Sequence, residues 1–199
     1  MKWNILVLAA TAALCMAASC QSGQKNQLSQ AEATLQTIAQ RTSVRQYVKG
    51  KQVEQEKVDK LLRAAMAAPS GMDRRPWEFV VVNERAALDS LAAALPYAKM
   101  LSHAPMAVIV AGDTTKSEYW YLDCSAAAQN LLLAAKALDL GAVWTAAYPY
   151  EDRMESVRSC LQLPPQVKPL CVIPVGYPDG AFQPKDKWDE TRVHYNKWK

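Results

Sequence analysis

The chain has 199 residues, of which 50% are hydrophobic and 21% are charged. This composition is close to that of an average folded protein and excludes disordered and fibrous classes, and the length suits one domain with one core. The formal net charge of +4 comes from 23 basic and 19 acidic residues that are dispersed along the chain. Because no basic run is interleaved with aromatic side chains, we expect no nucleic-acid partner.

The first segment combines a lone Lys2 with an apolar stretch from Ile5 to Ala18, which Cys20 follows closely. The stretch is shorter than the about 20 apolar residues that span a membrane, so it predicts an export signal over residues 1–19. Small residues before a cysteine resemble a bacterial lipoprotein signal. This resemblance implies a lipid anchor at Cys20 on a protein that faces the periplasm or the exterior. An ordinary cleaved signal and an uncleaved anchor are the alternatives.

The polar residues 20–30 are expected to form a flexible tether, and residues 31–199 are expected to form the folded domain. Three cysteines remain after the signal, namely Cys124, Cys160 and Cys171. An odd number argues against a complete disulfide framework, and their spacings suit no zinc site. Cys124 and Cys171 lie in apolar segments, which predicts buried and inert thiols.

Two helical patterns open the folded part. Residues 31–40 carry Leu35, Ile38 and Ala39 on one face, which predicts an amphipathic helix. A second pattern begins at about Glu54 and must end before Pro69. Its apolar positions follow helical spacing and are all expected to be buried: Val58, Leu61, Leu62, Ala65 and Met66.

Between these helices lies Arg41-Thr-Ser-Val-Arg-Gln-Tyr47, which holds two guanidinium groups and two hydroxyls within five residues. On an extended backbone the side chains of Arg41, Ser43 and Arg45 would point to one face. The planar fork of arginine matches the geometry of phosphate. The pattern therefore predicts an anion clamp, and a solvated basic turn is the alternative.

Strands and helices alternate in the rest of the chain. Continuous apolar runs predict four strands: 78–83, which we expect at the centre of the sheet, 104–111, 142–147 and 170–177. Helical patterns cover 86–95, 118–140 and 151–160. The longest is apolar nearly all round, which predicts a buried helix with Gly141 as its cap. Pro174 indicates a bulge or an edge in the last strand. The order predicts an α+β fold with helices on a mixed sheet of four to five strands.

Six segments, in this order along the chain, together resemble the FMN-dependent nitroreductase family. They are R-x-S-x-R-x-Y at 41–47, A-P-S-G-M-D-x-x-P-W-x-F at 68–79, D-x-x-x-A-x-Q-N-L-x-L-A-A from Asp123, L-G-A-V-W at 140–144, I-P-V-G-Y-P at 173–178 and V-H-Y-N-K-W at 193–198. Several segments in the family's order are far more specific than any one alone. The resemblance implies a nitroreductase-like fold, bound FMN and an intertwined homodimer with two flavin sites at its interface.

The resemblance also implies three groups of flavin contacts. Arg41, Ser43 and Arg45 would bind the phosphate and ribityl chain, and possible partners of the phosphate are Lys185 and Lys187, with solvated lysines as the alternative. The backbone of Trp144, Thr145 and Ala146 would pass near the ring. The loop that reaches the flavin of the other subunit would contribute Pro69, Ser70, Gly71, Met72, Asp73 and Arg75.

Two residues of this loop depart from the family pattern. Asp73 stands where the family most often has Asn, and Arg75 stands where Gln or Glu is commoner. A carboxylate only accepts hydrogen bonds, whereas an amide also donates them, so the contacts with the flavin edge must differ. An internal ion pair unrelated to flavin is the alternative.

The resemblance implies an oxidoreductase that passes two electrons from an NAD(P)H-like donor to a nitroaromatic, quinone or similar acceptor by a ping-pong mechanism. We expect no catalytic side chain, because the flavin carries the hydride chemistry. A non-catalytic flavin-binding or interaction lipoprotein with the same fold is one alternative, and reductive dehalogenation or enone reduction is another. The donor stays open, because an exported domain lies where NAD(P)H is not normally supplied.

Overall fold

The computed structural model describes residues 28–198. The predicted signal, Cys20 and most of the predicted tether lie outside the described residues. The chain divides into two units between Leu35 and Gln36. The boundary falls within helix α2 (Gln30–Gln40), which begins with a capping box: the backbone N–H of Ser29 donates to Glu32 Oε2 at 2.9 Å, and that of Glu32 donates to Ser29 Oγ at 3.2 Å. Across the described residues, no helix is both long and apolar enough to cross a membrane.

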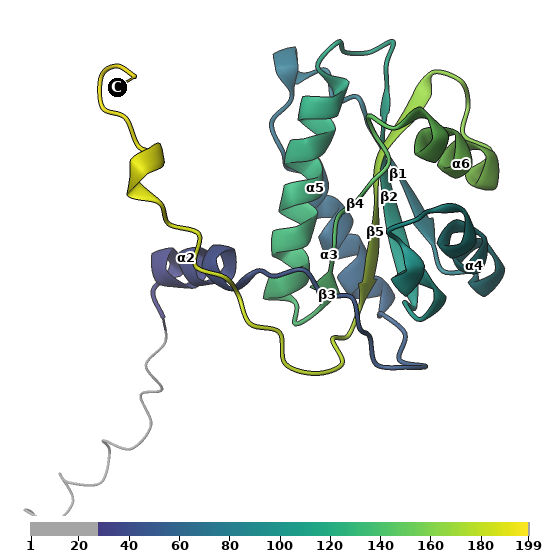
Figure 1. Ribbon diagram of the computed structural model, residues 1–199, viewed down its shortest axis with the longest axis horizontal. Helices are drawn as coiled ribbons and strands as arrows, with labels where there is room; N and C mark the ends of the chain where they lie inside the picture. The colour runs from purple at the N-terminus through teal and green to yellow at the C-terminus, as the bar shows by residue number, and fades with distance from the viewer. Residues whose placement is uncertain (1–27, 199) are drawn as a thin grey trace, which may run out of the picture. The chain divides into compact units, whose positions relative to one another are not determined.

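The second unit is built on a five-stranded sheet (Figure 1). Its strands are β1 (Trp77–Val82), β2 (Met106–Asp113), β3 (Gly141–Ala142), β4 (Thr145–Ala146) and β5 (Val167–Gly176). They lie in the order β1-β2-β5-β3, β4 also pairs with β5, and all these pairings are antiparallel. A parallel bridge joins Ser43 to Ala142. The predicted α+β fold with a small sheet is therefore confirmed.

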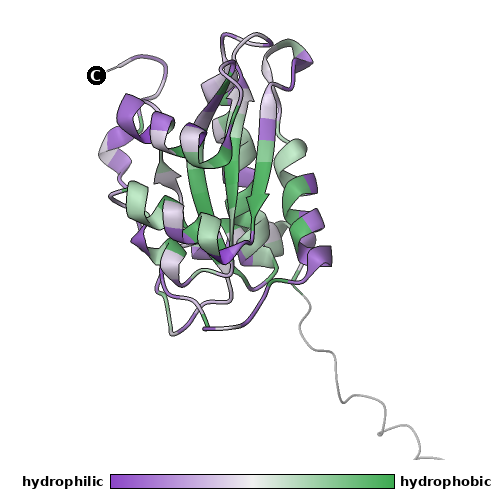
Figure 2. Ribbon diagram, turned by 90° about the vertical axis from the view of Figure 1, so that its right-hand side faces the viewer, coloured by the Kyte–Doolittle hydropathy of each residue, from purple (hydrophilic) through white to green (hydrophobic). Residues whose placement is uncertain are grey.

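Two helices cover each face of this sheet. α3 (Gln55–Met66) and α5 (Trp120–Ala137) lie on one face, and α4 (Arg85–Ala94) and α6 (Glu151–Leu161) lie on the other (Figure 1). The strands between these layers are the most hydrophobic part of the ribbon in Figure 2. Three short 3-10 helices, η1 (Gly71–Asp73), η2 (Lys99–Ser102) and η3 (Glu190–Arg192), complete the described elements.

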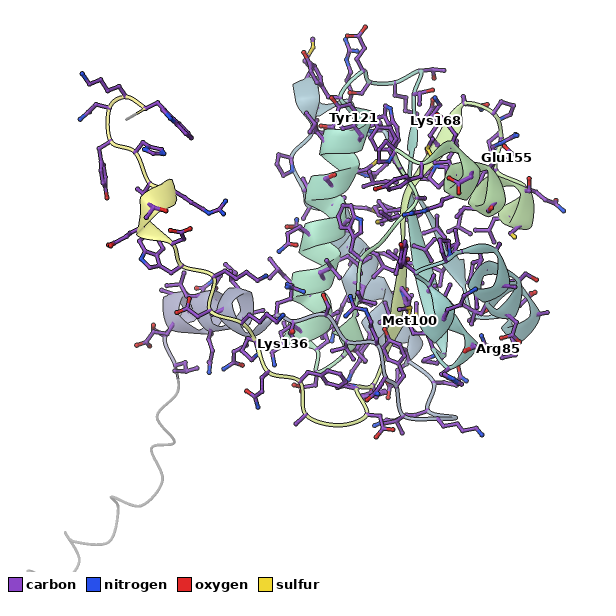
Figure 3. The ribbon with its side chains drawn as sticks, in the orientation of Figure 1. Arg85, Met100, Tyr121, Lys136, Glu155 and Lys168 are labelled. Atoms are coloured by element: carbon purple, nitrogen blue, oxygen red, sulfur yellow. The ribbon has the colours of Figure 1, made fainter. Side chains whose placement is uncertain are left out.

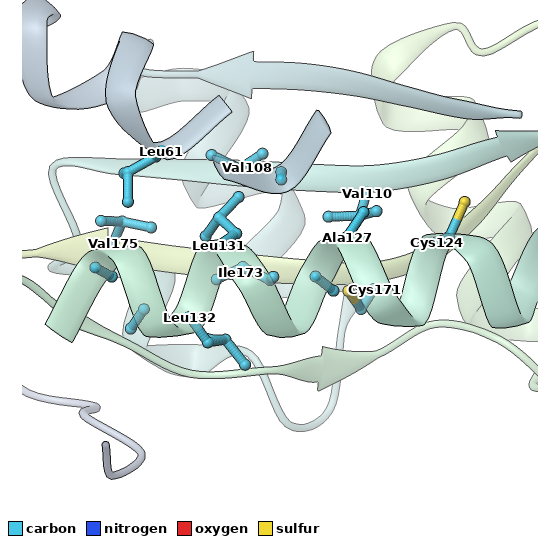
Figure 4. Packing of buried hydrophobic residues seen from close by; sticks show 14 of the residues in the cluster. Leu61, Val108, Val110, Cys124, Ala127, Leu131, Leu132, Cys171, Ile173 and Val175 are labelled. Carbon is cyan, nitrogen blue, oxygen red and sulfur yellow. The ribbon is translucent and has the colours of Figure 1, made fainter. Parts of the chain in front are cut away.

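The core forms on both sides of β2 and β5, because successive side chains of a strand point to opposite faces. Val108 and Ile173 belong to the larger cluster with Leu61 and Leu131 of the two helices on that face (Figure 4). The neighbouring strand residues Ile109 and Val172 belong to the second cluster, which includes Leu88, Leu91 and Val157 of α4 and α6. This double burial explains the continuous apolar runs in the sequence.

The prediction that the first strand lies at the centre of the sheet is wrong, because β1 is an edge strand. Its apolar run has another cause: Trp77 and Phe79 pack into one cluster, while Val80 and Val82 pack into the other. Helices thus cover both faces of β1 although its outer edge is unpaired in the sheet. Val81 is 37% exposed.

The predicted burial of two helices holds only in part. On α3, Val58, Leu61 and Ala65 are buried as predicted, but Leu62 is only half-buried and Met66 is 52% exposed. The buried stripe of the helix is therefore narrower than the apolar pattern in the sequence. α5 is shorter than predicted and is not buried all round, because Leu122 is 54% exposed. One face of α5 packs on the sheet and on α3, and its opposite face is largely half-buried, with Leu122 and Gln129 exposed.

The predicted strand 142–147 is divided into β3 and β4. Both pair with β5 in one unchanged register, with Ala142 opposite Val175 and Thr145 opposite Val172, so Val143 falls opposite Pro174. Proline has no N–H to donate, which explains the interruption there. The last strand does contain a bulge, but at Leu170 and not at Pro174: β2 pairs Val110 with Cys171 and the next residue, Ala111, with Pro169.

Gly141 does not cap α5, contrary to the prediction. The left-handed position beyond the helix is Asp139, with a φ of 58°, and the N–H of Leu140 donates to Ala135 O at 2.8 Å. Gly141 instead lies in β3, where the segment that holds the predicted clamp approaches the sheet closely.

Candidate functional site

The predicted clamp is an extended segment that runs beside β3. The backbone N–H of Val44 donates to Ala142 O at 3.1 Å, and the Val44 side chain is buried. Because side chains alternate along an extended backbone, Val44 points into the protein, and the less buried Ser43 and Arg45 flank it. The sheet and the buried Val44 thus fix the backbone of the clamp.

Tyr47 anchors the end of this segment. Its buried hydroxyl donates to Val44 O at 2.8 Å and approaches Pro174 O at 3.2 Å. Burial raises the pKa of the Tyr47 phenol, so the hydroxyl stays protonated and can serve as a donor. The tyrosine therefore ties the clamp to β5.

Arg41 opens into a groove with a volume of about 730 Å³, which we call the Arg41 groove. The groove brings Arg41 together with Lys185 and Lys187, about 140 residues further along the chain, as the sequence suggested. The carboxylate of Asp186 is also present, and its Oδ1 accepts from the backbone N–H of Trp188 at 3.0 Å. Three cations against one carboxylate make this groove suitable for an anion. The other lining residues are Ile38, Ala39, Gln129 and Pro184.

Arg45 opens into a different groove of about 440 Å³, which we call the Arg45 groove. It contains the predicted residues Trp144, Thr145 and Ala146. The Thr145 hydroxyl donates to Val172 O at 2.6 Å, so it is used within the sheet. Five residues that the sequence did not suggest complete the lining: Pro96, Tyr97, Lys99, Met100 and Arg153. Figure 3 labels Met100 in this region, and it labels Lys136, which lines a smaller cavity together with Arg41.

The two arginines of the clamp therefore serve two grooves rather than one. Ser43 lies between them in the chain and lines neither groove. Loop 69–75 also lines neither groove of its own chain. The structure thus divides the first predicted group: Arg41 lies with Lys185 and Lys187, and Arg45 lies with segment 144–146, while loop 69–75 lies apart from both grooves.

A buried carboxylate holds the tip of loop 69–75. The backbone N–H of Gly71 donates to Asp123 Oδ1 at 2.9 Å, and the Ser117 hydroxyl donates to Asp123 Oδ2 at 3.1 Å. Ser70 Oγ accepts from the backbone N–H of Arg75 at 3.0 Å. The sequence motif contained Asp123, but no signal in the chain indicated this partner.

The exposed end of the loop has an unusual backbone. Met72, Asp73 and Arg75 have φ values of 54°, 56° and 47°, in the left-handed region that residues with a side chain seldom adopt. Met72 is 81% exposed. Such positions cost conformational energy and often lie at binding sites.

Asp73 and Arg75 form the internal ion pair that the sequence left open as an alternative. Arg75 Nε donates to Asp73 Oδ1 at 2.7 Å, and Nη2 donates to Oδ2 at 2.5 Å. These hydrogen bonds, and then the guanidinium charge, lower the pKa of the Asp73 carboxyl. The carboxylate is therefore occupied by its neighbour in this chain.

Arg153 is the residue of the Arg45 groove with the most unusual surroundings, and the sequence did not indicate it. Its guanidinium carbon lies 3.8 Å from the centre of the Tyr150 ring and 5.0 Å from that of the Tyr97 ring. Its Nε is buried and has no hydrogen-bond partner. One arginine within a polar helical segment cannot be distinguished from a solvated surface residue by sequence alone, so no pattern pointed to Arg153.

The predicted thiols behave as expected. Cys124 and Cys171 are buried and free, while Cys160 is free and exposed. Burial raises the pKa of the Cys124 thiol to about 12 and also raises that of Cys171. Both buried thiols are therefore protonated and unreactive at neutral pH.

Known proteins similar to this chain were found by sequence and by structure. The profile of the nitroreductase family matches residues 38–96 and 89–177. A protein of Methanothermobacter thermautotrophicus named "Putative NADH dehydrogenase/NAD(P)H nitroreductase" is 44% identical over 167 residues, which are 82% of this chain and 87% of that protein.

Two solved structures extend this comparison. A protein of the same name from Bacteroides thetaiotaomicron is 64% identical, with a TM-score of 0.82 over 83% of this chain and 98% of that one. An FMN-dependent nitroreductase from Clostridium difficile is 31% identical, with a TM-score of 0.78 over 82% of this chain and 99% of that one.

Proposed function

This chain belongs to the nitroreductase family, and we propose that it is an FMN-dependent oxidoreductase. It would transfer two electrons from an NAD(P)H-like donor to a nitroaromatic, quinone or similar acceptor. The observation that carries this proposal is the convergence of Arg41, Lys185 and Lys187 on one groove. That convergence suits the dianionic phosphate of the cofactor named for a similar structure.

The residues of the two grooves fit the separate parts of FMN. Arg41 and the two lysines can give charge-assisted hydrogen bonds to the phosphate, because arginine and lysine are donors with full charges. Arg45 and the backbone of 144–146 border the second groove, which suits the edge of a flat ring system. The ribityl chain would pass between the grooves along the clamp, where the Ser43 hydroxyl is available.

Bound FMN would supply the hydride chemistry, so the protein needs no nucleophile of its own. The chain contributes a fixed backbone: Val44 and Tyr47 hold the clamp against the sheet, and the ladder with β5 holds β4. Backbone N–H groups near a flavin can orient it and stabilise the charge that its reduction creates. We propose a ping-pong sequence in which the donor leaves before the acceptor binds.

We further propose a homodimer in which loop 69–75 of one subunit reaches the flavin of the other. Several large apolar side chains of the described residues are exposed in a single chain, which suggests that another surface covers them. They are Ile38, Leu122, Trp188, Tyr195 and Trp198. The position of loop 69–75 away from the grooves of its own chain also supports this arrangement.

The test is the absorption spectrum of the purified protein before and after anaerobic NADH. We expect bound oxidised flavin that NADH bleaches and that a nitroaromatic restores. A protein that stays colourless after refolding with FMN would contradict the proposal that it binds this flavin. With bound flavin, double-reciprocal plots should be parallel when NADH is varied at several acceptor concentrations, and intersecting lines would contradict the ping-pong sequence.

We propose, on sequence grounds alone, that residues 1–19 are a signal and that Cys20 carries a lipid anchor. Residues 20–30 would be the tether and 31–199 the folded domain. Metabolic labelling with a fatty acid should mark the wild type and spare Cys20→Ser. Equal labelling of both proteins would show that Cys20 does not carry the lipid.

A non-catalytic flavin-binding lipoprotein is the second candidate. The internal pair of Asp73 with Arg75 favours it, because the carboxylate that replaces the usual amide is already occupied. Steady turnover with any chemical or enzymatic reductant would exclude this candidate.

A further inference from the structure

We propose that Arg153 makes the Arg45 groove a subsite for aromatic acceptors that carry a carboxylate. The proposal rests on the function above and adds the class of acceptor. It is carried by an arginine that is held in place, has no anionic partner, and lies in a groove without acidic residues.

Two aromatic rings hold the guanidinium of Arg153. Its central carbon lies 3.8 Å from the ring centre of Tyr150 and 5.0 Å from that of Tyr97, distances at which a cation is attracted to the face of an aromatic ring. The backbone N–H of Arg153 also donates to Tyr150 O at 3.1 Å. The side chain is thus positioned from the first turn of α6.

The same guanidinium lacks the partners that arginine normally has. Its Nε is buried without a hydrogen bond, and in the described part of the chain no ion pair or hydrogen bond of its side chain occurs. Buried polar groups in proteins are nearly always paired, so an unpaired one needs an explanation. A ligand cannot reach the buried Nε itself, but the Nη groups of the same guanidinium also have no partner among the described residues and can donate to an acceptor oxygen in the groove.

The groove selects for negative charge. Arg45, Lys99 and Arg153 line it, and none of its nine lining residues is acidic. Lys99 uses two of its three N–H donors within the chain, because its Nζ donates to Ala92 O at 2.8 Å and to Ala93 O at 3.3 Å. Arg45 is assigned to the flavin, and the phosphate has its own groove around Arg41. Arg153 is therefore the cation left for another molecule.

The remaining lining residues favour a flat ring. Segment 144–146 is assigned to the flavin, but Tyr97 and Met100 also line the groove and give it aromatic and apolar walls, which bind planar aromatic molecules by dispersion and stacking. A carboxylate on such a ring can accept two hydrogen bonds from one guanidinium. The chemistry of the groove thus points to an aromatic acid.

The reaction of such an acceptor balances without a further reactant. For 4-nitrobenzoate, two electrons and two protons convert the nitro group into a nitroso group and one water molecule. NADH supplies the electron pair and one proton, and solvent supplies the second proton. The carboxylate is unchanged and serves only in binding.

The test compares 4-nitrobenzoate with its neutral analogue 4-nitrobenzamide on the FMN-loaded protein. In Arg153→Met the ratio of the two kcat/KM values should fall about tenfold, because a hydrogen-bonded charge is lost. Arg153→Lys should keep part of the ratio. Arg158→Met is the matched control on the same helix, where Arg158 pairs with Glu155, and its ratio should not change. An unchanged ratio in Arg153→Met overturns the proposal.

Two further measurements separate this subsite from the cofactor and the donor. The FMN content of Arg153→Met and its rate of anaerobic reduction by NADH should equal those of the wild type. Loss of FMN would assign Arg153 to the cofactor, and slower reduction would assign it to the phosphates of the donor. Either result overturns the acceptor subsite.

Calorimetric binding of 4-nitrobenzoate gives a readout that does not need turnover. We expect a dissociation constant about tenfold higher in Arg153→Met than in the wild type. If the protein reduces neither acceptor, the proposed function fails, but this binding difference still decides the subsite. Equal affinities in both proteins would overturn it.

Discussion

Val44 and Gly141 lie so close together that a Cβ added to Gly141 would meet Val44 Cγ1 at 2.5 Å. The contact joins the clamp to β3, next to the hydrogen bond from the Val44 N–H to Ala142 O. Glycine is needed at this position because the Val44 side chain packs directly against the Gly141 backbone, and not because of a helix cap. The relationship makes the placement of the clamp sensitive to a single methyl group.

Gly141→Ala should therefore destabilise the protein and weaken FMN binding. Overpacking of this kind costs about 1–3 kcal/mol of unfolding free energy. Denaturant unfolding and FMN titration measure the two effects. The double variant Gly141→Ala/Val44→Ala removes Val44 Cγ1 and Cγ2 but keeps the Val44 Cβ, which the added Cβ would meet at 2.7 Å. It should therefore recover only part of the loss, since neighbouring substitutions are not additive. Additive losses in the double variant would contradict the close contact.

Arg41→Ala and Arg45→Ala should differ in their response to the phosphate of the flavin. Because Arg41 lies in the groove with Lys185 and Lys187, its removal should weaken FMN about tenfold or more and leave riboflavin unaffected. Arg45→Ala should weaken both ligands. Arg63→Ala, an exposed arginine of α3, serves as the control. Equal effects of Arg41→Ala on FMN and riboflavin would show that the two grooves are misassigned.

Asp123→Ala should loosen loop 69–75. The substitution removes the acceptor of the Gly71 N–H and leaves the Ser117 hydroxyl without its partner, at a cost of about 1–3 kcal/mol. Limited proteolysis should then cut within the loop. Asp123→Asn should be milder, because the amide oxygen can accept from Gly71 while its N–H₂ donates to Ser117. An uncut loop in Asp123→Ala would show that the hydrogen bond from Gly71 to Asp123 does not hold the loop.

Asp73→Asn should change flavin binding more than stability. The pair with Arg75 is exposed, and exposed pairs contribute little, so the melting temperature at neutral pH should hardly change. The pKa of Asp73 is lowered in the folded protein, so any stabilisation is present above its ordinary pKa of 3.8 and is lost as the pH falls through the lowered value. Any difference between the two proteins should therefore vanish in acid.

The same substitution supplies an N–H donor at the position where related sequences usually carry Asn. In an FMN-binding homodimer, Asp73→Asn should therefore raise the retention of FMN on dialysis. Arg75→Gln is the companion variant, because it also breaks the ion pair but leaves the carboxylate in place. Higher retention in both variants would indicate that the pair, and not the missing donor, limits binding.

Leu122→Arg should reduce dimer formation and FMN retention together. Leu122 is an exposed apolar residue of α5, and a charge there would be buried without a partner in a dimer that covers it. Size-exclusion chromatography and flavin absorbance report the two quantities. Cys160→Arg adds the same charge at an exposed site of α6 and should change neither. A dimer that survives Leu122→Arg with full flavin would place the interface elsewhere.

The sequence alone determined the elements and the family. Local patterns identified the helices α2 to α6 and the strands β1, β2 and β5, because apolar periodicity records which side chains face the core. The segments from Arg41 to Tyr47 and from Ala68 to Phe79 pointed to the nitroreductase family, which the comparisons confirm. The burial of Cys124 and Cys171 also followed from their apolar surroundings.

Only the tertiary structure decided which strands are neighbours and which residues meet in each groove. The apolar run of β1 cannot distinguish an edge from a centre, because helices cover both faces in either case. The spacing of Arg41 and Arg45 in the sequence predicts only that both side chains point to one face. It cannot reveal that they open into two grooves, since the walls of each groove come from distant segments. The rings of Tyr97 and Tyr150 meet Arg153 for the same reason: local periodicity records burial, whereas partners are set by how the elements pack.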